Sequence, residues 1–301
     1  MTVRIKVLSG MNIAEARAPQ DGRIGLSVSG RAVDFRVASQ PTIHGENIVL
    51  RILDRQKGIV PLEEIGLDEE HLHQLKLMIA RPEGIILVTG PTGSGKTTTL
   101  YSVLNHINAE GIHIMTLEDP VEYPMALVRQ TSVSETAKLD FANGIRSMMR
   151  QDPDVILVGE VRDNETAEMA FRAAMTGHQV YTTLHTNSAL GAIPRLLDIG
   201  VLPDIMAGNI IGIIAQRLVR RLCEHCKTPY HAEQHETRLF GKLAESEKPL
   251  LFKATGCVLC DFQGYRGRIA IIELLRIDAA LDELIARRAT THEIRARALM
   301  Q

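Results

Sequence analysis

Residues 90–99 carry glycines, a lysine and threonines at a spacing that could hold a chain of phosphate groups. The segment matches the P-loop pattern Gly-x-x-x-x-Gly-Lys-Thr, whose fixed positions are Gly90, Gly95, Lys96 and Thr97. Glycines lack a Cβ atom, so the backbone can turn several N–H groups toward one anion. We predict that Lys96 reaches the β- and γ-phosphates of a nucleotide and that the Thr97 hydroxyl binds Mg²⁺. The residues expected to contact the nucleotide are Gly90, Pro91, Thr92, Gly93, Ser94, Gly95, Lys96, Thr97 and Thr98.

The surroundings of this segment favour a P-loop over a glycine-rich turn that merely contains Lys-Thr. An apolar run, GIILVT, precedes it at 84–89, and a helical pattern follows at 97–108. The dipole of that helix would direct about half a positive charge at the phosphates. Strand patterns then alternate with helical ones: strands at 112–117, 155–159 and 179–184, helices at 140–151, 164–175 and 188–199. This alternation predicts an α/β fold with a parallel sheet and the nucleotide at the carboxyl edge of that sheet.

Three further side chains should meet at that edge, because each comes at the end of an expected strand. Glu118 lies in TLEDPVEY (116–123), Glu160 follows VILVG, and His185 follows the strand at 179–184. A carboxylate in this place can hold Mg²⁺ or act as a base toward water, and we favour Glu160 as the base. The alternative is that both acids only cap helices or lie in linkers. His185 is placed to sense a phosphate, whereas His178 is as readily structural.

The cysteines fall into two pairs, Cys223-x-x-Cys226 and Cys257-x-x-Cys260. In a cytosolic chain this arrangement predicts a structural tetrathiolate zinc site instead of disulfides. Zinc binding is worth about 10–16 kcal/mol in small modules, which is enough to order a segment with little core of its own. Two alternatives stay open, a redox role for either pair and a histidine in place of one cysteine, from among His225, His231 and His235. The segment between the pairs is expected to form an exposed hairpin or helical excursion.

Composition limits the classes of protein that fit. The 301 residues are 45% hydrophobic and 23% charged, with a net charge of −2. This length predicts about two domains. We expect a cytosolic protein, because no apolar run approaches the roughly 20 residues of a membrane span and no signal-peptide pattern is seen. The lack of a basic excess and the aromatic content of 4% argue against nucleic-acid binding.

The two ends of the chain carry patterns of their own. Strands are expected at Val3–Leu8, 23–28, 31–37 and 48–53, with a tight hairpin turn at Ser29-Gly30, then a linker at 61–68 and a helix at 69–80. Five arginines near the N-terminus are either solvated strand charges or residues that face a nucleotide: Arg17, Arg23, Arg31, Arg36 and Arg51. At the other end a strand at 268–277 precedes helices at 279–288 and 292–300, with Thr291 as the expected cap. Both ends are expected to lie inside a longer protein.

Together these segments resemble the secretion ATPases of type II secretion and type IV pilus assembly. The resemblance runs from APQDGRI (18–24) to RIAIIELL (268–275), and it includes the P-loop, TLEDPVEY, RQDPDVILVGEVRD (150–163) and TGHQVYTTLHTNSA (176–189). QRLVRRLC (216–223) and the paired cysteines match the extension-type branch of the family. The resemblance leads us to expect that the additional N-terminal domain usual in the family is missing from these 301 residues, and RIAIIELL stands where a Gly-Ile-Tyr segment is more usual.

The resemblance implies a hexameric ring of two-domain subunits. Each would have a PAS-like α+β N-terminal domain (1–60) and a RecA-like P-loop ATPase domain (69–301) with an inserted zinc module near 217–268. The implied cofactors are ATP, Mg²⁺ and Zn²⁺. Arg23 and Arg36 would close over the nucleotide, with Arg17 and Arg51 as weaker candidates. Glu160 and Glu118 would activate water and organise the metal, in an order that the resemblance does not assign.

The expected function is ATP hydrolysis that powers pilin or pseudopilin assembly. The implied partners are an inner-membrane platform protein and its cytoplasmic adaptor, which would place the chain in the cytoplasm, peripheral at the inner membrane. One alternative is a RecA-like nucleic-acid motor, which DNA-stimulated hydrolysis would support. The other is a nucleotide-dependent scaffold in which hydrolysis is incidental.

Overall fold

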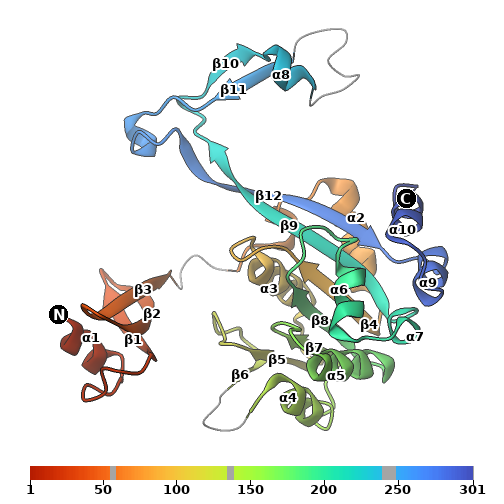
Figure 1. Ribbon diagram of the computed structural model, residues 1–301, viewed down its shortest axis with the longest axis horizontal. Helices are drawn as coiled ribbons and strands as arrows, with labels where there is room; N and C mark the ends of the chain where they lie inside the picture. Colours follow the sequence, from red (N-terminus) through yellow and green to blue (C-terminus); the bar gives the residue numbers. More distant parts are fainter. Residues whose placement is uncertain (55–58, 134–138, 239–248, 301) are drawn as a thin grey trace. The chain divides into compact units, whose positions relative to one another are not determined.

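The chain forms two compact units, Met1–Ile59 and Val60–Gln301, each with its own sheet (Figure 1). Its structure, a computed structural model, describes residues 1–54, 59–133, 139–238 and 249–300. Within these ranges no helix combines the length and the apolar character that crossing a bilayer requires.

The first unit is an antiparallel sheet with one helix, α1 (Thr2–Leu8), packed on it. Its strands are β1 (Gln20–Val28), β2 (Arg31–Thr42) and β3 (Gly45–Asp54), in the order β1-β2-β3. The predicted hairpin is confirmed, since Ser29 and Gly30 join β1 to β2 with φ angles of 53° and 78°. Two consecutive positive φ angles are what a two-residue turn needs to match the twist of its strands.

The N-terminal segment differs from its prediction, because Val3–Leu8 forms helix α1 and not a strand. Ile5 of this helix packs on a small core made by Met11, Ile24 and Val37. Lys6 is 1% exposed, and its Nζ donates to the Glu15 carbonyl at 2.6 Å and to Oε1 of Glu46 at 2.5 Å. Over six residues an apolar alternation does not separate strand from helix, and here burial against the sheet selects the helix.

The second unit begins with the segment expected to be a linker, 61–68. This segment contains a 3₁₀ turn, η2 (Leu62–Glu64), which lies against α3 (Lys96–Ile107). Leu62 and Ile65 are buried there. Asp68 then caps α2 (Glu69–Ile79) by accepting a hydrogen bond from the His71 N–H at 2.9 Å.

A seven-stranded sheet forms the centre of this unit, in the order β12-β9-β4-β8-β7-β5-β6. Its strands are β4 (Gly84–Thr89), β5 (Ile114–Glu118), β6 (Arg129–Ser132), β7 (Val155–Val158), β8 (Gln179–Leu184), β9 (Ile210–Leu222) and β12 (Tyr265–Arg276). Every neighbouring pair is parallel except β12 and β9, which are antiparallel. The predicted parallel sheet is confirmed in its central strands. Strands β6 and β9 are additions that the sequence patterns did not predict.

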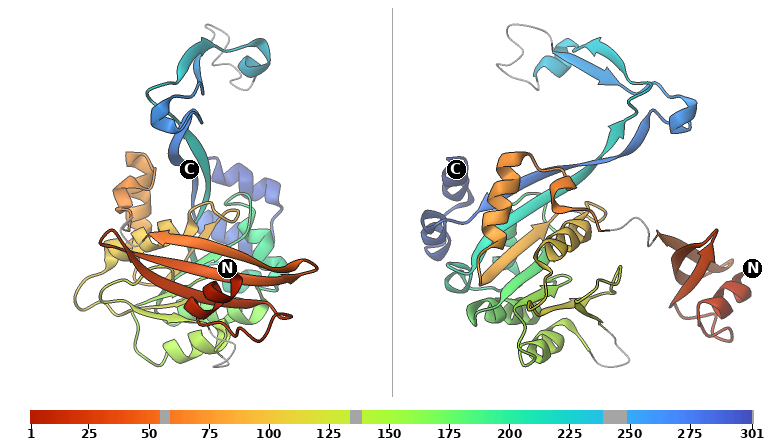
Figure 2. Two further views of the ribbon diagram at one scale, coloured as in Figure 1. Left: turned by 90° about the vertical axis from the view of Figure 1, so that its left-hand side faces the viewer. Right: turned by 180° about the vertical axis from the view of Figure 1, so that it is seen from behind.

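Helices cover both faces of this sheet (Figure 2). They are α2, which contacts β12, then α3, α4 (Phe141–Met148), α5 (Asn164–Met175), α6 (Ala192–Ile199) and α7 (Pro203–Met206). The connection through α3 crosses the sheet from β4 toward β5, whereas the connections through α4, α5 and α6 return in the other direction. Because such crossovers are right-handed, α3 lies on the opposite face from the other three.

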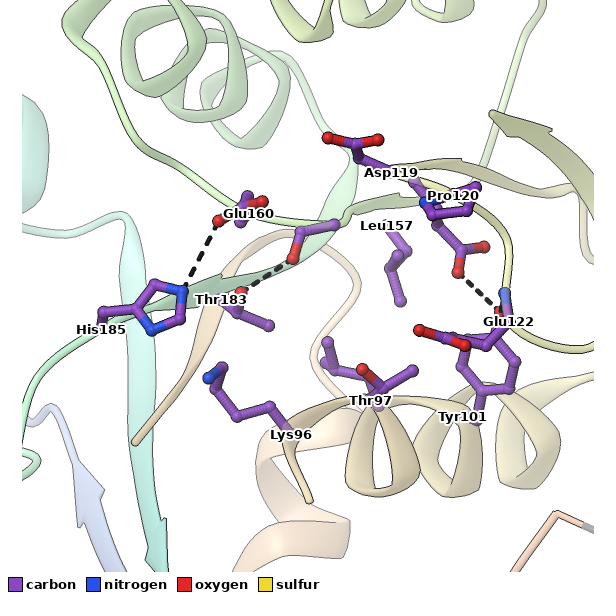
Figure 3. Close-up of a pocket in the computed structure, with 13 residues that line it drawn as sticks. Lys96, Thr97, Tyr101, Asp119, Pro120, Glu122, Leu157, Glu160, Thr183 and His185 are labelled. Atoms are coloured by element: carbon purple, nitrogen blue, oxygen red, sulfur yellow. Dashed lines mark hydrogen bonds and ion pairs between the residues drawn. The ribbon is translucent and has the colours of Figure 1, made fainter. Parts of the chain in front are cut away.

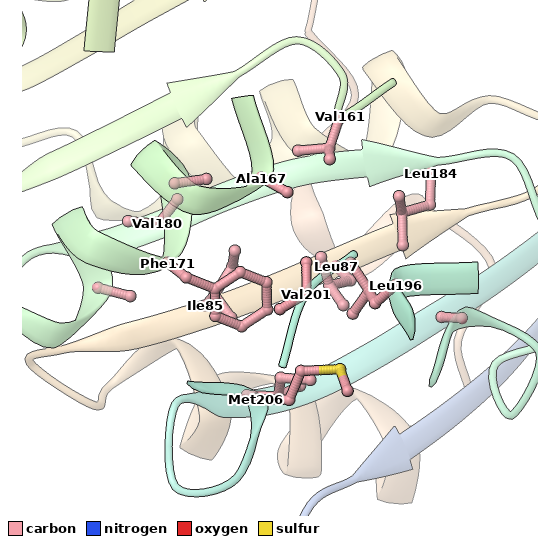
Figure 4. Close-up of a cluster of buried hydrophobic side chains, with 14 of the residues drawn as sticks. Ile85, Leu87, Val161, Ala167, Phe171, Val180, Leu184, Leu196, Val201 and Met206 are labelled. Carbon is pink, nitrogen blue, oxygen red and sulfur yellow. The ribbon is translucent and has the colours of Figure 1, made fainter. Parts of the chain in front are cut away.

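The main core lies between the central strands and the helices on one face (Figure 4). Every residue of β4 and of β8 is buried, as expected for parallel strands covered on both sides. Phe171 of α5 packs beside Ile85, and Leu196 of α6 beside Leu87. This packing holds the carboxyl ends of the strands in fixed positions.

Strands β9 and β12 continue past the sheet as a two-stranded arm, defined here as residues 216–222 and 265–272. Strand β4 pairs with β9 only as far as Ala215, whereas β9 and β12 stay paired to Leu222 and Tyr265. Beyond the arm lie the four cysteines, a 3₁₀ turn η4 (Val258–Cys260), and the antiparallel pair β10 (Thr228–His231) and β11 (Leu250–Lys253), with α8 (Gln234–Thr237) (Figure 1). The pair agrees with the expected hairpin between the cysteine pairs.

The chain ends in α9 (Ala279–Ala286) and α10 (Thr291–Ala298). The cap of α10 is Thr290, so the prediction of Thr291 is wrong by one position. Thr290 accepts from the Glu293 N–H at 3.3 Å, and Glu293 accepts from the Thr290 N–H at 2.8 Å. This reciprocal pair needs a threonine three residues before the glutamate, which Thr290 satisfies and Thr291 does not.

Candidate active site

The P-loop follows β4 and leads into α3, as the sequence pattern predicts. Gly90, Gly93 and Gly95 have φ angles of 148°, 78° and 92°, which side chains rarely adopt, and Gly95 is the N-terminal cap of α3. A Cβ atom at Gly90 would lie 2.3 Å from the Gln216 carbonyl oxygen. One at Gly95 would lie 2.9 Å from Nε2 of Gln216. The two glycines are therefore needed for their conformation and for their close approach to β9.

A cavity of about 170 Å³ lies beside the start of α3, at the carboxyl edge of the sheet. It brings together five of the predicted side chains from four separate segments: Lys96, Thr97, Glu118, Glu160 and His185 (Figure 3). Its other lining residues are Leu100, Tyr101, Asp119, Pro120, Glu122, Leu157, Gly159 and Thr183. A cation, hydroxyls and carboxylates thus face one space, which suits a phosphorylated ligand with its metal ion.

Lys96 lies at one wall of this cavity. Its Nζ donates to the carbonyl oxygens of Gly90 at 2.9 Å and Pro91 at 3.3 Å. Burial lowers the pKa of Lys96, and the nearby carboxylate of Glu160 partly opposes that effect. The ammonium is half buried at the loop and is available to pair with an anion.

Glu160 follows β7 and lies among positive or potentially positive groups. Its side chain is 15% exposed, and its Oε2 is 3.5 Å from Nε2 of His185 (Figure 3). Its Oε1 accepts from Arg162, and this hydrogen bond is the main reason why the pKa of Arg162 is raised. Arg162 was not among the predicted site residues, although it stands in the same segment as Glu160. The pairing holds the carboxylate at the mouth of the cavity.

Glu118, the last residue of β5, is buried and accepts hydrogen bonds at both carboxylate oxygens. The Tyr101 hydroxyl donates to its Oε2 and the Thr116 hydroxyl to its Oε1, both at 2.6 Å. Burial raises the pKa of Tyr101, and the Glu118 carboxylate raises it further, so the hydroxyl remains a donor. Sequence reasoning missed Tyr101 and Thr116, because neither belongs to a recognised phosphate or metal pattern.

The strand that ends near His185 is tied to its neighbours by threonine hydroxyls. Thr183 donates to the Gly159 carbonyl at 2.8 Å, and the Thr186 N–H donates to Oγ1 of Thr89 at 2.8 Å. His185 therefore lies between two residues that are held by hydrogen bonds, Thr183 to the segment before Glu160 and Thr186 to the strand before the P-loop. His178 lies at the other end of β8 and contacts the Ala173 carbonyl through Nδ1 at 2.9 Å, as a structural histidine would.

Three of the predicted arginines, Arg23, Arg36 and Arg51, share one face of the sheet of the first unit. Arg23 of β1 lies directly opposite Arg36 of β2, and Arg36 lies opposite Arg51 of β3. Arg23 and Arg51 are exposed, and Arg36 is partly buried.

The four cysteines form a compact group beyond the arm. All their sulfur atoms lie within 4.8 Å of one another, and the separations Cys223–Cys257 and Cys226–Cys260 are 4.0 and 3.8 Å. Sulfurs at 2.3 Å from a tetrahedral zinc ion would be about 3.8 Å apart, so the group fits that metal. Burial disfavours the Cys260 thiolate, but N–H donors from Cys257 and Gly264 help to lower its pKa to about 7. No histidine joins the group among the residues that the structure describes.

A P-loop at the carboxyl edge of a parallel sheet, with a lysine and two acids around one cavity, defines a P-loop nucleotide-binding α/β protein. Comparison with known proteins makes this more specific. The chain belongs to the Type II/IV secretion system protein family, whose model matches residues 1–301. The resemblance predicted from the motifs is thereby confirmed.

Named relatives and a solved structure agree with this family. The chain is 49% identical over 282 residues to the Type II secretion system ATPase E of Vibrio cholerae, covering 94% of this chain and 56% of the relative. It is 48% identical over 291 residues to the Type II secretion system protein E of Pseudomonas aeruginosa, covering 97% and 58%. A crystal structure of the pilus retraction motor PilT with bound ADP superposes with a TM-score of 0.70 at 32% identity, covering 95% of this chain and 71% of PilT. The chain thus spans 56–58% of the length of these two curated relatives.

Proposed function

We propose that the chain is the ATP-hydrolysing part of a motor that powers pilin or pseudopilin assembly in a type IV pilus or a type II secretion system. The observation that carries this proposal is the single cavity lined by Lys96, Thr97, Glu118, Glu160 and His185. The relatives named as secretion ATPases support the assignment of the motor, and the PilT structure with ADP supports the nucleotide.

The geometry supports a division of roles within the cavity. Lys96 binds the β- and γ-phosphates, and the backbone of residues 90–98 surrounds them. The Thr97 hydroxyl and the Glu118 carboxylate are the oxygen ligands that suit Mg²⁺, which neutralises charge on the phosphates when bound. Glu160 acts as the base that takes a proton from the attacking water, and His185 orients Glu160 and senses the γ-phosphate. The four cysteines hold Zn²⁺ as a structural ion.

The assembly that we propose is a homo-hexamer. In it residues 1–60 act as a PAS-like domain, 61–68 as a connecting segment and 69–301 as a RecA-like ATPase domain with the zinc module at about 217–268. Arg23 and Arg36 neutralise the negative charge that develops on the phosphates during hydrolysis. An arginine in that role raises the rate of hydrolysis by about 10³–10⁵-fold. The partners are an inner-membrane platform protein and its cytoplasmic adaptor, which recruit a cytoplasmic motor to the membrane periphery.

The test is the ATPase rate per subunit as a function of protein concentration, with light scattering to follow assembly. The proposal expects a rate that rises with assembly, is lost in Lys96→Ala, and collapses in Arg23→Ala and Arg36→Ala. Lys76→Ala and Arg4→Ala are the matched controls, since Lys76 of α2 pairs with Glu63 of η2 and Arg4 is exposed on α1. If the ATPase rate per subunit does not change with protein concentration or in either arginine variant, the proposed hexameric ring is overturned. Binding of ATP without hydrolysis would favour the alternative of a nucleotide-dependent scaffold.

A further inference from the structure

One buried glutamine on β9 contacts the P-loop at four places along its length. Gln216 is 3% exposed, and its Nε2 donates to the Ser94 carbonyl at 2.7 Å. Its Oε1 accepts from the Thr99 hydroxyl at 2.8 Å. Its backbone and side chain also occupy the space that Cβ atoms at Gly90 and Gly95 would need.

The chemistry of these contacts leaves the amide only one orientation. The Ser94 carbonyl can only accept a hydrogen bond, so the group that faces it must be the NH₂ of Gln216. The Gln216 carbonyl then faces Thr99, whose hydroxyl can donate. A buried amide with both ends paired in this way is rigid, and it fixes the distance between the loop and the first turn of α3.

Gln216 also stands where the arm leaves the sheet. Ala215, the preceding residue, is the last residue of β9 that pairs with β4, opposite Thr89. From Gln216 onward β9 pairs only with β12 on its way to Cys223. The residue that holds the P-loop is therefore the first residue of the arm.

We infer that Gln216 is a positioning residue for nucleotide binding, acting through its hydrogen bond to the Ser94 carbonyl. This bond turns the Ser94–Gly95 peptide so that the N–H groups of the loop face the phosphates. Loss of the bond leaves a buried carbonyl without its donor, and the loop then relaxes away from the binding geometry. The inference rests on the proposed function, since it assumes that the loop binds a nucleotide.

The test compares variants in the affinity for ADP with Mg²⁺, measured by titration calorimetry, and in the thermal midpoint of the nucleotide-free chain. Gln216→Met keeps the length of the side chain and removes both hydrogen bonds. Gln179→Met is the matched control, because Gln179, the first residue of β8, is also buried and its Nε2 donates to the Ile79 and Arg81 carbonyls at and just after the end of α2. Gln216→Glu keeps the shape and the acceptor but lacks the donor, and Thr99→Val removes only the bond to α3.

The expected result is an ADP dissociation constant about tenfold higher in Gln216→Met and Gln216→Glu, the loss that an unmade buried hydrogen bond typically produces. The ADP dissociation constants of Gln179→Met and Thr99→Val should stay within about twofold of that of the unmodified chain. The thermal midpoints of Gln216→Met and Gln179→Met should be similar to each other. Unchanged affinity in Gln216→Glu, or an equal loss in Thr99→Val, would overturn the inference. Failure of the unmodified chain to bind ADP would instead overturn the proposed function, and this inference with it.

Discussion

The hydroxyl of Tyr101 donates a hydrogen bond to Oε2 of Glu118 at 2.6 Å, and both residues line the cavity of the candidate active site. The same hydroxyl accepts from the Glu122 N–H at 3.2 Å and from Nε2 of Gln130 at 3.3 Å. Tyr101 is 3% exposed and Glu118 is 5% exposed. One phenol on α3 therefore joins the end of β5 to the loop after it and orients a carboxylate that we assign to the metal.

Removal of this hydroxyl in Tyr101→Phe should lower the free energy of unfolding of the second unit by about 1–3 kcal/mol. The physical reason is that the variant removes the donor to Oε2 of buried Glu118 and the oxygen that accepts from the Glu122 N–H and from Gln130. Denaturant unfolding measures this change, and the Mg²⁺ concentration that gives half-maximal ATPase rate should rise in parallel. Tyr230→Phe is the control, since the Tyr230 hydroxyl bonds to Glu236 away from the cavity. An unchanged Mg²⁺ requirement would limit Tyr101 to a role in stability.

Replacement of Glu160 by Gln should reduce ATP turnover by about 10²–10⁴-fold and leave ADP binding within a few-fold, because an amide cannot take a proton from water. Single-turnover hydrolysis and calorimetry separate these two quantities. Glu168→Gln is the control, as Glu168 is an exposed residue of α5 that pairs with Arg172. Full turnover in Glu160→Gln would transfer the role of base to another residue and leave Glu118 as the first candidate.

The tetracysteine group should hold one Zn²⁺ per chain, which metal analysis of the purified protein measures. Replacement of Cys223 by Ser should remove most of this metal and increase amide exchange in β10 and β11, because the segment beyond the arm has little core of its own. His225→Ala and His231→Ala should retain the metal, since neither histidine belongs to the group. Metal loss in either histidine variant would restore the alternative of a mixed cysteine and histidine site.

The buried pair between Lys6 and Glu46 should make the first unit sensitive to acid. The hydrogen bond from Lys6 holds the pKa of Glu46 below its ordinary value of 4.5, although burial acts the other way. A carboxyl with a lowered pKa contributes stability above its unfolded value, and that stability is lost as the pH falls through the folded value. Amide exchange in β2 and β3 should therefore accelerate below about pH 4.5 in the unmodified chain.

Lys6→Met removes the donor that does most to lower the pKa of Glu46, so protonation of Glu46 should cost less stability, and the acceleration of exchange below about pH 4.5 should become smaller. Glu15→Gln is the matched control, because Lys6 contacts the backbone carbonyl of Glu15 and not its carboxylate. An equally large acceleration in Lys6→Met would show that other carboxyls govern the acid sensitivity of this unit.

The elements that sequence patterns predicted well are those whose signal is contained in a few adjacent residues. The P-loop glycines, the apolar strands 84–89 and 179–184 and the hairpin turn at Ser29-Gly30 all appear where the patterns put them. Strand β6, whose residues Arg129–Ser132 are polar, has no such signal and forms because β5 offers it an edge. Helix α1 likewise depends on the sheet that buries Lys6, so the alternation at Val3–Leu8 predicted the wrong element.

The candidate chemistry could be predicted from the amino-acid sequence, because a phosphate loop and paired thiols are short patterns whose residue types indicate what they bind. How those groups are held follows from the three-dimensional fold. Tyr101 and Glu118 are 17 residues apart, Lys6 and Glu46 are 40 apart, and Ser94 and Gln216 are 122 apart. Contacts of this kind follow from strand order and side-chain packing. A hydrogen bond between residues far apart in the sequence produces no local sequence pattern. It can be recognised only in the folded chain, where the donor and the acceptor lie close together.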